Sequence, residues 1–457
     1  MNVATPPNTL GEFFIPATTS LQERRPRTLK HGETFAVFDQ NGDILAGDGV
    51  PEGLYHRDTR YLSRIELIIN GRRPILLSST MRDDNAMLTC DLTNPDLEDA
   101  SGYVIEHDLI HIRRSKFLYD AGCYERLSVR NYSDQEQELA IEIRFDADYA
   151  DLFEVRGNRR SHRGERHRPI VENPGVTLAY TGLDQKRRTT SVRFYPKPAR
   201  LEASRAFFHL KLGRGERAVI YLEIGCDRAG SAEQPISSFL VLMRKARQEM
   251  RRGASRAAAI TTANHIFNEA MCRAISDLTM LVTDTEQGPY PYAGIPWYST
   301  AFGRDALITA LQTLWLDPAI AGGVLSYLAY HQAQEFNPAA DAEPGKILHE
   351  VRHGEMAELG EVPFRCYYGS VDSTPLFIML AGAYLERTGD LATVRRLWPN
   401  IEAGLGWIDR YGDRDGDGFV EYYRLTDSGL ANQGWKDSHD SVFHADGATA
   451  EGPIALV

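Results

Sequence analysis

The sequence predicts two architectures in series, an antiparallel β-sandwich followed by a helical toroid. Two observations lead to this prediction. Residues from about 34 to 227 alternate apolar and polar side chains with a period of two, broken by turn residues, which is typical of antiparallel strands. From about residue 260 onward, apolar residues recur at helical spacing in consecutive paired segments, which favours a helical toroid over an α/β fold.

The strand region has its clearest local signal at Ile65–Ile69. Asn70-Gly71 follows, and this dipeptide supplies the positive φ angles of a two-residue hairpin turn, so we expect Pro74–Leu77 to be the returning strand. A further strand is expected at 139–145. Further antiparallel pairs are expected at 103–112 with 124–129, at 176–180 with 190–195, and at 206–212 with 218–224. Ten or more short strands over about 200 residues predict a two-sheet sandwich.

The same patterns predict the domain organisation. We expect an N-terminal tail at 1–30, the sandwich at 31–235, a charged helical linker at 236–258 and a helical catalytic domain at 259–457. Amphipathic helices are expected at about 260–281, 303–316, 318–336, 374–387 and 391–411.

Charge distinguishes the two halves. Residues 1–256 hold 39 Lys and Arg against 36 Asp and Glu, while residues 257–457 hold 12 against 27. The acidic second half argues against a nucleic-acid ligand, because neutralising phosphates needs basic residues, and a neutral polyol fits better. The sequence has no membrane-length apolar run and begins without an export signal, so we expect a soluble, cytoplasmic protein.

The loops of the helical half are asymmetric. Long connections rich in charged, polar and aromatic residues are expected at Trp297–Asp305, Tyr367–Thr374 and Gly412–Ser441. The last of these would precede a sixth helix near Pro453. In an alternating stack the N-termini of alternate helices lie on one face, so all three loops should open on the same side. That face would hold Trp297, Tyr298, Arg304, Asp305, Tyr367, Tyr368, Asp372, Ser373, Trp435, Lys436 and Asp437.

These residue types suit a sugar. Aromatic faces stack on the C–H face of a sugar ring, while an arginine and carboxylates bind its hydroxyls, and a carboxyl such as Asp437 can also transfer a proton. Structural alternatives stay open. Asp372 stands before Ser373-Thr374-Pro375 and could cap a helix, and Arg304-Asp305 could be a structural ion pair. The 432–438 segment could be a solvated loop with one half-buried tryptophan.

Other polar stretches are weaker candidates. Asp413–Gly418 begins like a calcium loop, but Arg424 stands where a bidentate glutamate belongs, so we favour a helix-ending turn and predict no metal site and no cofactor. The arginine-rich 156–168 stretch lacks aromatic residues for base stacking and is interpreted as a solvated loop. Charged and aromatic residues at 53–61 fit a buried ion-pair corner at least as well as ligand contact.

Several motifs together resemble the bacterial amylo-α-1,6-glucosidase or glycogen-debranching type of enzyme. In the first half they are Phe35-Ala36-Val37 with Gly47-Asp48-Gly49, and Asp58–Ser63. In the second half they are Phe302–Asp305, Asp372–Pro375 and Asn432–Ser438. The resemblance implies an N-terminal antiparallel β-sandwich followed by an (α/α)6 barrel. It also implies an inverting hydrolase of α-glucosidic bonds, with an α-glucan or oligosaccharide as substrate.

The resemblance implies that Asp437 is the general acid, which protonates the departing glycosidic oxygen. Arg304, Asp305, Asp372 and Trp435 would shape the subsite for the cleaved glucosyl unit. The full set of candidate substrate-binding residues is Trp297, Tyr298, Arg304, Asp305, Tyr368, Asp372, Gln433, Trp435 and Lys436.

An inverting mechanism also needs a basic carboxylate about 6.5–9.5 Å from the acid, and in such enzymes it lies late in the barrel. Five of the twelve helices of that barrel are expected in this chain, so we predict an incomplete barrel, a fragment of a longer enzyme and little hydrolysis by residues 1–457 alone. The alternatives are a hydrolase of trehalose or another small α-glucoside, and a non-catalytic carbohydrate-binding protein. The sequence does not indicate an oligomeric state.

Overall fold

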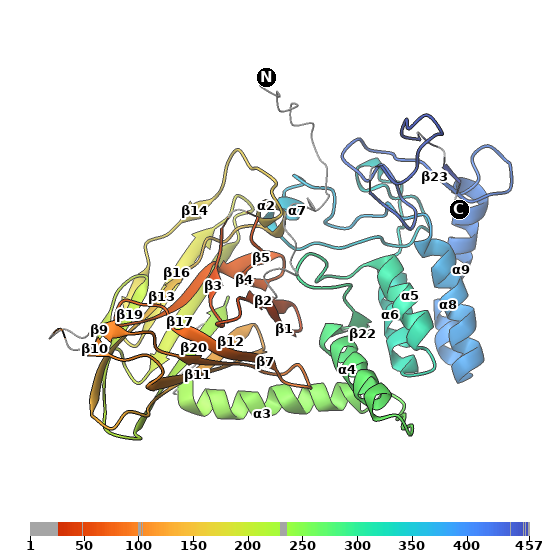
Figure 1. Ribbon diagram of the computed structural model, residues 1–457. Coiled ribbons are helices and arrows are strands. Elements are labelled where there is room, and N and C mark those ends of the chain that lie inside the picture. The colour runs from red at the N-terminus through yellow and green to blue at the C-terminus, as the bar shows by residue number, and fades with distance from the viewer. Residues whose placement is uncertain are drawn as a thin grey trace. The chain divides into compact units, whose positions relative to one another are not determined.

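The computed structural model describes residues 26–455 apart from 48, 99–101, 103, 229–234, 439, 451 and 453. Strands come first and helices second, which confirms the predicted fold class (Figure 1). The chain forms two compact units. The first holds the described residues up to Thr283 together with Gly294–Ser299, and the second holds Asp284–Ala293 and the described residues from Thr300 onward. Residues 1–25 of the predicted tail lie outside the described residues.

Two large antiparallel sheets make up the sandwich of the first unit. The larger sheet runs in the order β14 (Glu165–Arg166), β16 (Gly175–Thr181), β17 (Arg187–Tyr195), β20 (Arg217–Cys226), β12 (Gly122–Asn131), β11 (Ile110–Tyr119), β8 (Leu88–Thr93) and β7 (Ile75–Met81), with β15 (Ile170–Glu172) paired to β16. The smaller sheet runs in the order β18 (Arg200–Leu201), β19 (Arg205–Leu212), β13 (Gln137–Asp146), β6 (Arg64–Ile69) and β3 (Ile44–Leu45).

A third sheet and some short elements complete this unit. The third sheet runs in the order β1 (Arg27–His31), β2 (Thr34–Phe38), β4 (Gly53–His56) and β5 (Thr59–Leu62). The short elements are β9 (Leu97–Glu98), β10 (Val104–Ile105) and helix α2 (Leu152–Val155).

The core of the sandwich lies between the two large sheets. Strand β13 shows the expected alternation, because Leu139, Ile141, Ile143 and Phe145 are buried while the residues between them are more exposed. These side chains share one apolar cluster with residues of the larger sheet, among them Ile112, Leu127, Phe194 and Leu222. Two facing apolar surfaces of this kind define a sandwich.

Strand pairing confirms some predicted pairs and corrects others. β16 pairs with β17, as the alternation predicted. The expected pair of 103–112 with 124–129 is only partly correct, because β11 begins at Ile110 and most of its rungs with β12 lie beyond residue 112. The expected pairs β6 with β7 and β19 with β20 are wrong, because the two members of each pair lie in different sheets. Adjacent strands in a sandwich can cross from one sheet to the other, and periodicity alone does not distinguish that crossing from a hairpin.

The Asn70-Gly71 turn shows why the pairing prediction failed. Both residues have positive φ, 44° and 78°, so the predicted turn conformation is present. Arg72 donates its backbone N–H to Ile69 O, which closes the turn. Beyond this one rung the chain leaves β6 and enters the opposite sheet as β7, so a local turn signal did not determine the long-range partner.

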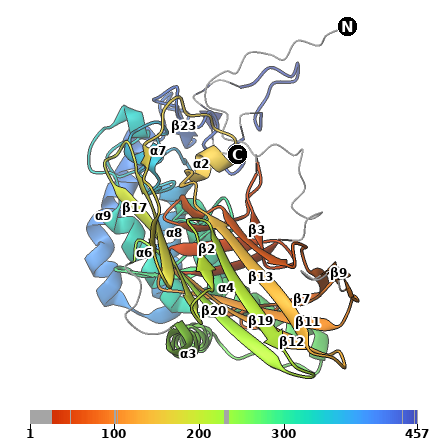
Figure 2. The ribbon, with the colours of Figure 1, turned by 90° about the vertical axis from the view of Figure 1, so that its left-hand side faces the viewer.

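Helix α3 (Pro235–Ala254), which covers most of the predicted linker, packs on the outer face of the larger sheet. Phe239 and Ala246 of the helix share an apolar cluster with Phe117, Tyr124 and Tyr221 of the sheet. Figures 1 and 2 show α3 running along the sheet beside β11, β12 and β20. The helix is therefore a third layer of the first unit.

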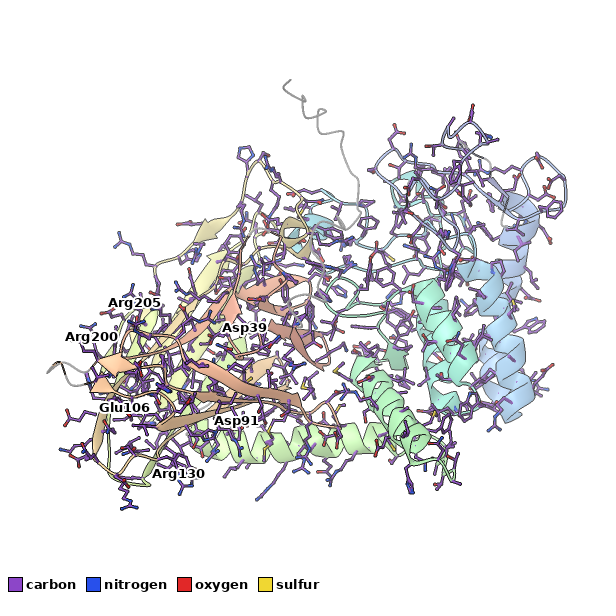
Figure 3. The ribbon with its side chains drawn as sticks, in the orientation of Figure 1. Asp39, Asp91, Glu106, Arg130, Arg200 and Arg205 are labelled. Atoms are coloured by element: carbon purple, nitrogen blue, oxygen red, sulfur yellow. The ribbon has the colours of Figure 1, made fainter. Side chains whose placement is uncertain are left out.

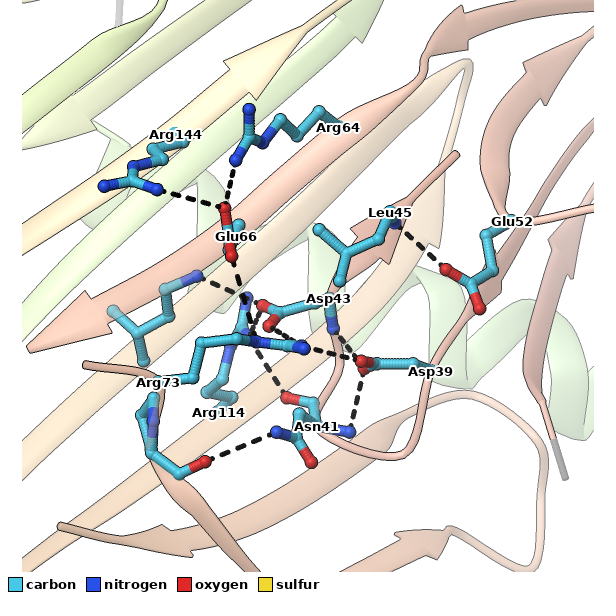
Figure 4. A network of polar contacts seen from close by, with 12 residues as sticks. Asp39, Asn41, Asp43, Leu45, Glu52, Arg64, Glu66, Arg73, Arg114 and Arg144 are labelled. Carbon is cyan, nitrogen blue, oxygen red and sulfur yellow. Dashed lines mark hydrogen bonds and ion pairs between the residues drawn. The ribbon is translucent and has the colours of Figure 1, made fainter. Parts of the chain in front are cut away.

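A buried network of charges lies between the two sheets, and Figure 4 shows the part of it around Asp43, with Arg73 and Arg114. Arg114 of β11 donates to Glu125 of β12 at 2.6 Å and also to Asp43, while Lys116 donates to the same Glu125. All four side chains are 1–2% exposed. Arg73 adds a second partner for Asp43 at 2.7 Å. Complete pairing is what makes such deep burial of charge tolerable.

The network also sets the pKa of its central carboxyl. Burial by itself would raise the pKa of Glu125, but Arg114 and Lys116 outweigh burial and lower that pKa to about 2. Several other charges of the sandwich lie on its surface. Arg130, Arg200 and Arg205 are exposed (Figure 3), and Arg200 covers the Phe207 ring at 4.2 Å.

The charged stretch at 53–61 forms a buried corner, as the structural alternative predicted. Arg60 is 6% exposed, and its Nε lies 3.1 Å from both carboxylate oxygens of Asp148. Its Nη1 also lies 3.4 Å from the carbonyl oxygens of Val50 and Glu52. This arginine ties β5 to the chain that follows β13.

The helical region contains the five expected helices, although α4 begins at His265 instead of about residue 260 and α6 ends at Tyr330 instead of about residue 336. Its elements are α4 (His265–Leu281), β21 (Val282–Thr285), β22 (Gly288–Pro291), α5 (Gly303–Thr313), α6 (Pro318–Tyr330), the 3₁₀ turn η1 (Pro338–Ala340), α7 (Glu355–Glu358), α8 (Ser373–Thr388), α9 (Leu391–Tyr411), β23 (Glu421–Tyr422) and β24 (Ile454–Ala455). Of these, α4 belongs to the first unit, where Asn85 donates to Asp277 at 2.6 Å.

Local signals explain the short connections that pair the helices. Asp317 caps α6 by accepting from Ala319 N, and Pro318 occupies the first helical position. Gly389 ends α8 in the left-handed conformation with φ 69°, and Asp390 then caps α9 by accepting from Thr393 N. The expected sixth helix near Pro453 is not found: Ile454–Ala455 pair with β23 as a strand, and Pro453 lies outside the described residues.

Across the part of the chain that the structure describes, no helix is long and apolar enough to span a bilayer.

Candidate active site

The loop before α5 fixes the position of Arg304. Gly303 opens the helix, and a Cβ at this position would lie 1.9 Å from the backbone oxygen of Leu348, so only glycine fits without moving the chain. The backbone N–H of Gly303 donates to His349 O at 2.8 Å. Arg304 follows directly and is 6% exposed, so its guanidinium is held on a rigid support.

Arg304 brings the three predicted loops together. Its Nη2 donates to Asp437 Oδ2 at 2.8 Å, and its Nη1 lies 3.4 Å from Asp372 Oδ2 and also donates to the backbone oxygen of Gly434. The guanidinium lies 5.8 Å from the centre of the Trp435 ring. The prediction that the three loops meet on one face is therefore correct for Arg304, Asp372, Trp435 and Asp437.

The electrostatics of the site centre on Arg304. Burial opposes its charge, but the carboxylates of Asp372 and Asp437 outweigh burial and raise the pKa of Arg304. Asp305 differs from its neighbours. Its side chain is exposed, yet surrounding chain removes enough water to raise the pKa of its carboxyl against the opposing pull of Arg304.

The two structural alternatives for this cluster are not what the structure shows. Asp372 precedes α8, but its side chain makes no capping hydrogen bond. It instead accepts from Ser370 Oγ at 2.6 Å and faces Arg304. The ion pairs of Arg304 are with Asp372 and Asp437, not with the adjacent Asp305. Both carboxylates thus lie at the guanidinium, where a ligand hydroxyl could compete for its donors.

The 432–438 segment combines buried supports with an exposed tip. Asn432 is 1% exposed; its Nδ2 donates to Ser438 O at 2.6 Å and its Oδ1 accepts from Tyr422 at 2.9 Å. By contrast, the Trp435 residue is 66% exposed and the Asp437 side chain 44% exposed, and Lys436 is exposed as well. The alternative of a solvated loop with one half-buried tryptophan does not describe this segment, because the loop is anchored at Asn432 and the tryptophan is mostly exposed.

Two other predicted sugar-binding residues have buried side chains. Gln433 is fully buried and donates to Asp341 at 3.2 Å, and Tyr368 donates its hydroxyl to His331 O at 2.6 Å. Their side chains therefore support the loops instead of facing solvent.

Trp297 and Tyr298 belong to the first unit. Trp297 is 6% exposed in an apolar cluster with Phe35 and Tyr55, while Tyr298 is 41% exposed near Arg156. An aromatic residue in a loop can pack into a core or contact a ligand, and the spacing of apolar residues does not distinguish these two roles.

A supporting segment that the sequence did not predict lies between two of the loops. The backbone of 349–352 bonds to both neighbours: Val351 N donates to Ala301 O, and Tyr367 N donates to Glu350 O. Buried charged residues are dense in this segment, and Arg352 donates to Glu350 at 3.0 Å with both side chains at most 7% exposed. The sequence signal was the alternation of charged and apolar residues at 346–358, which matches no regular element.

The calcium-like stretch forms a tight turn. Asp413, Asp415 and Asp417 offer carboxylate oxygens within 4.8 Å of one another. Each of them, however, accepts backbone N–H groups of the same turn: Gly416 N and Gly418 N both donate to Asp413. Such bonds are expected of aspartates in a turn, so this arrangement gives no reason to assign a metal.

Comparison with solved structures shows that other proteins share the fold of this chain. It superposes on a candidate kojibiose phosphorylase from the human microbiome with a TM-score of 0.58 at 11% identity, covering 87% of this chain and 58% of that one. It also superposes on a bacterial glucoamylase complexed with acarbose, with a TM-score of 0.50 at 12% identity, covering 84% and 58%. The chain therefore spans less than two thirds of both proteins, and these likenesses define its fold.

A family model matches part of the chain. Residues 29–223, which include most of the sandwich, match the model described as the N-terminal domain of (some) glycogen debranching enzymes. No curated protein matches the sequence. The resemblance inferred from the motifs is thus confirmed for the sandwich, and the helical region shares its fold with the two solved structures.

Proposed function

We propose that the protein is a glycoside hydrolase that acts on α-glucosidic bonds of a glucan, with debranching as its activity. The observation that carries the proposal is the convergence of three loops on Arg304, which places two carboxylates and an exposed tryptophan together. The family of residues 29–223 supports the same substrate class. An aromatic platform beside charged hydrogen-bonding groups is the usual chemistry of a site for a sugar ring.

In this proposal Asp437 is the general acid. It is partly exposed, so a glycosidic oxygen can reach it, and only its Oδ2 is bonded to Arg304. A carboxylic acid can accept a hydrogen bond through one oxygen and donate its proton from the other, so Asp437 can act from Oδ1 while Oδ2 stays bonded to Arg304. Arg304, Asp305 and Asp372 would bind sugar hydroxyls.

The two remaining exposed residues would act on the sugar from the loop tip. Trp435 would stack on the sugar, and Lys436 would contact hydroxyls beside it. An inverting reaction also requires a base about 6.5–9.5 Å from the acid. Among the described residues we assign none to that role.

The experiment is glucose release from an α-1,6-branched oligosaccharide by the protein as its gene encodes it, compared with release from trehalose. We expect Asp437→Asn to lose at least about 100-fold in kcat while it still binds the oligosaccharide. The matched control is Asp427→Asn, which changes a fully exposed aspartate of the same loop. Saturable glucan binding without any turnover would contradict the proposal and favour a carbohydrate-binding protein.

A further inference from the structure

A single buried carboxylate lies beneath the loop that carries Asp437. Asp341 is 0% exposed and follows the 3₁₀ turn η1 in the left-handed conformation, with φ 51°. Its own backbone N–H donates to Pro338 O at 3.1 Å, and its carbonyl oxygen accepts from Lys346 Nζ at 3.2 Å. The position of the carboxylate is therefore set by the chain before the loop.

Asp341 bonds to two separate points of the 412–441 loop. Its Oδ1 accepts the backbone N–H of Leu425 at 2.6 Å, and its Oδ2 accepts Gln433 Nε2 at 3.2 Å. Oδ2 also accepts the hydroxyl of Tyr367 at 2.6 Å. One ionisable group thus joins the chain before α8 to both halves of the loop.

Tyr367 extends this anchor to a third point. Its hydroxyl accepts the backbone N–H of Leu430 at 2.7 Å, and its side chain is fully buried. Burial and the nearby Asp341 raise the pKa of Tyr367, so the hydroxyl stays protonated and donates to the carboxylate. Residues 425, 430 and 433 of the loop are therefore all tied to one buried pair.

The chain passes so close to this pair that glycine is needed at one position. A Cβ on Gly429 would lie 2.5 Å from Asp341 Oδ2 and 2.6 Å from the Tyr367 hydroxyl. Such a side chain would have to displace the carboxylate, the phenol or the loop. The contact thus rests on steric fit as well as on hydrogen bonds.

Gln433, which donates to Asp341, lies only four residues before Asp437 in the chain. Gln433 O accepts the backbone N–H of Val371 at 2.9 Å, and Asn432 Nδ2 bonds to Ser438 O across the tip. The tip between these two bonds contains Asp437 and the Gly434 carbonyl that contacts Arg304. A displacement of the anchored points would consequently move the carboxyl relative to Arg304.

We propose that Asp341 and Tyr367 are positioning residues that hold the 412–441 loop in register with Arg304 and thereby place Asp437. The proposal rests on the function proposed above only for its catalytic consequence. Neither residue contacts the sugar in this account, and both act through the loop. A misplacement of a reacting group by about 1 Å can cost about 100-fold in rate.

The test is amide hydrogen exchange of the protein and three variants, Tyr367→Phe, Gly429→Ala and Tyr384→Phe. Tyr384→Phe is the matched control, because it also removes a tyrosine-to-aspartate bond from this unit, 3.0 Å long to Asp390, away from the loop. We expect exchange within 425–438 to quicken at least about tenfold in Tyr367→Phe and in Gly429→Ala, while exchange in α9 stays unchanged in these two variants. The control variant should leave exchange within 425–438 unchanged.

Unchanged exchange at 425–438 in both loop variants would overturn the proposal, and so would equal acceleration throughout the unit, which signals general destabilisation. Hydrolysis supplies the second readout: Tyr367→Phe should lower kcat about tenfold or more with KM within about threefold. A protein that releases no glucose would contradict the proposed function alone, because the exchange data decide the anchoring independently.

Discussion

Arg114→Gln should destabilise the sandwich strongly, whereas Arg113→Gln should not. The two arginines are adjacent on β11 and point to opposite faces of the sheet, so their side chains are 2% and 52% exposed. Without Arg114, the buried carboxylate of Asp43 keeps its ion pair with Arg73, and the buried carboxylate of Glu125 keeps its ion pair with Lys116. Removing one partner from a buried charge network costs about 3–5 kcal/mol, while an exposed pair contributes about 0–1 kcal/mol.

The assay is urea unfolding followed by circular dichroism in the β-sheet band. With a slope of about 2 kcal/mol per molar urea, Arg114→Gln should lower the midpoint by about 2 M and Arg113→Gln by less than about 0.5 M. Equal shifts for the two variants would refute the reasoning, because burial would then not determine the cost. A stabilised Arg114→Gln protein would refute it as well.

The pH dependence of this difference provides a second check. The pKa of Glu125 is lowered to about 2 in the folded chain, below the value of about 4.3 for an unfolded glutamate. Its stabilising contribution is therefore fully present above about pH 4.3 and is lost as the pH falls towards 2. The gap between wild type and Arg114→Gln should narrow across that window, and a constant gap would contradict the assignment.

Three other outcomes follow from individual contacts. Burial lowers the pKa of Lys30 to about 7, so the unfolded chain binds an extra proton above that pH. Stability should rise by up to about 1.4 kcal/mol per pH unit between pH 7 and 10, and Lys30→Met should abolish the rise in urea titrations. Gly303→Ala places a Cβ against Leu348 O and should cost about 1–3 kcal/mol in calorimetric unfolding. Trp435→Ala should weaken oligosaccharide binding about threefold to tenfold by titration calorimetry, and leave the melting temperature unchanged because the ring is 66% exposed.

Much of the site could be predicted because its signals are local. Three long loops rich in charged and aromatic residues lie next to helices that the apolar period predicts. Because consecutive helices alternate in direction, the three loops are expected on one face. That reasoning placed Arg304, Asp372 and Asp437 together before any contact was known, and the structure shows those contacts. It failed for Trp297, because an aromatic loop residue can pack into a core as readily as it can face a ligand.

The supporting roles could not be predicted for a different reason. The sequence placed Tyr367 on the loop face but did not indicate its burial, and it gave no signal for Asp341. Nothing local indicates that Leu425 and Gln433 will bond to Asp341, or Leu430 to Tyr367. The distance along the chain from Asp341 to Gln433 is long, so their contact depends on how the intervening helices pack. Burial of a charged side chain becomes visible only when the surrounding chain is in place.

The sequence by itself determined the order of a sandwich and a helical region, the positions of the helices, and the loops that carry the chemistry. Its determinants are side-chain period, capping residues and turn residues, which act within a few positions of one another. Tertiary structure alone decided which strands pair, because β6 and β7 are joined by a tight turn yet lie in opposite sheets. It also decided that Arg304 joins Asp372 to Asp437, since such contacts depend on the packing of distant segments, which no local pattern encodes.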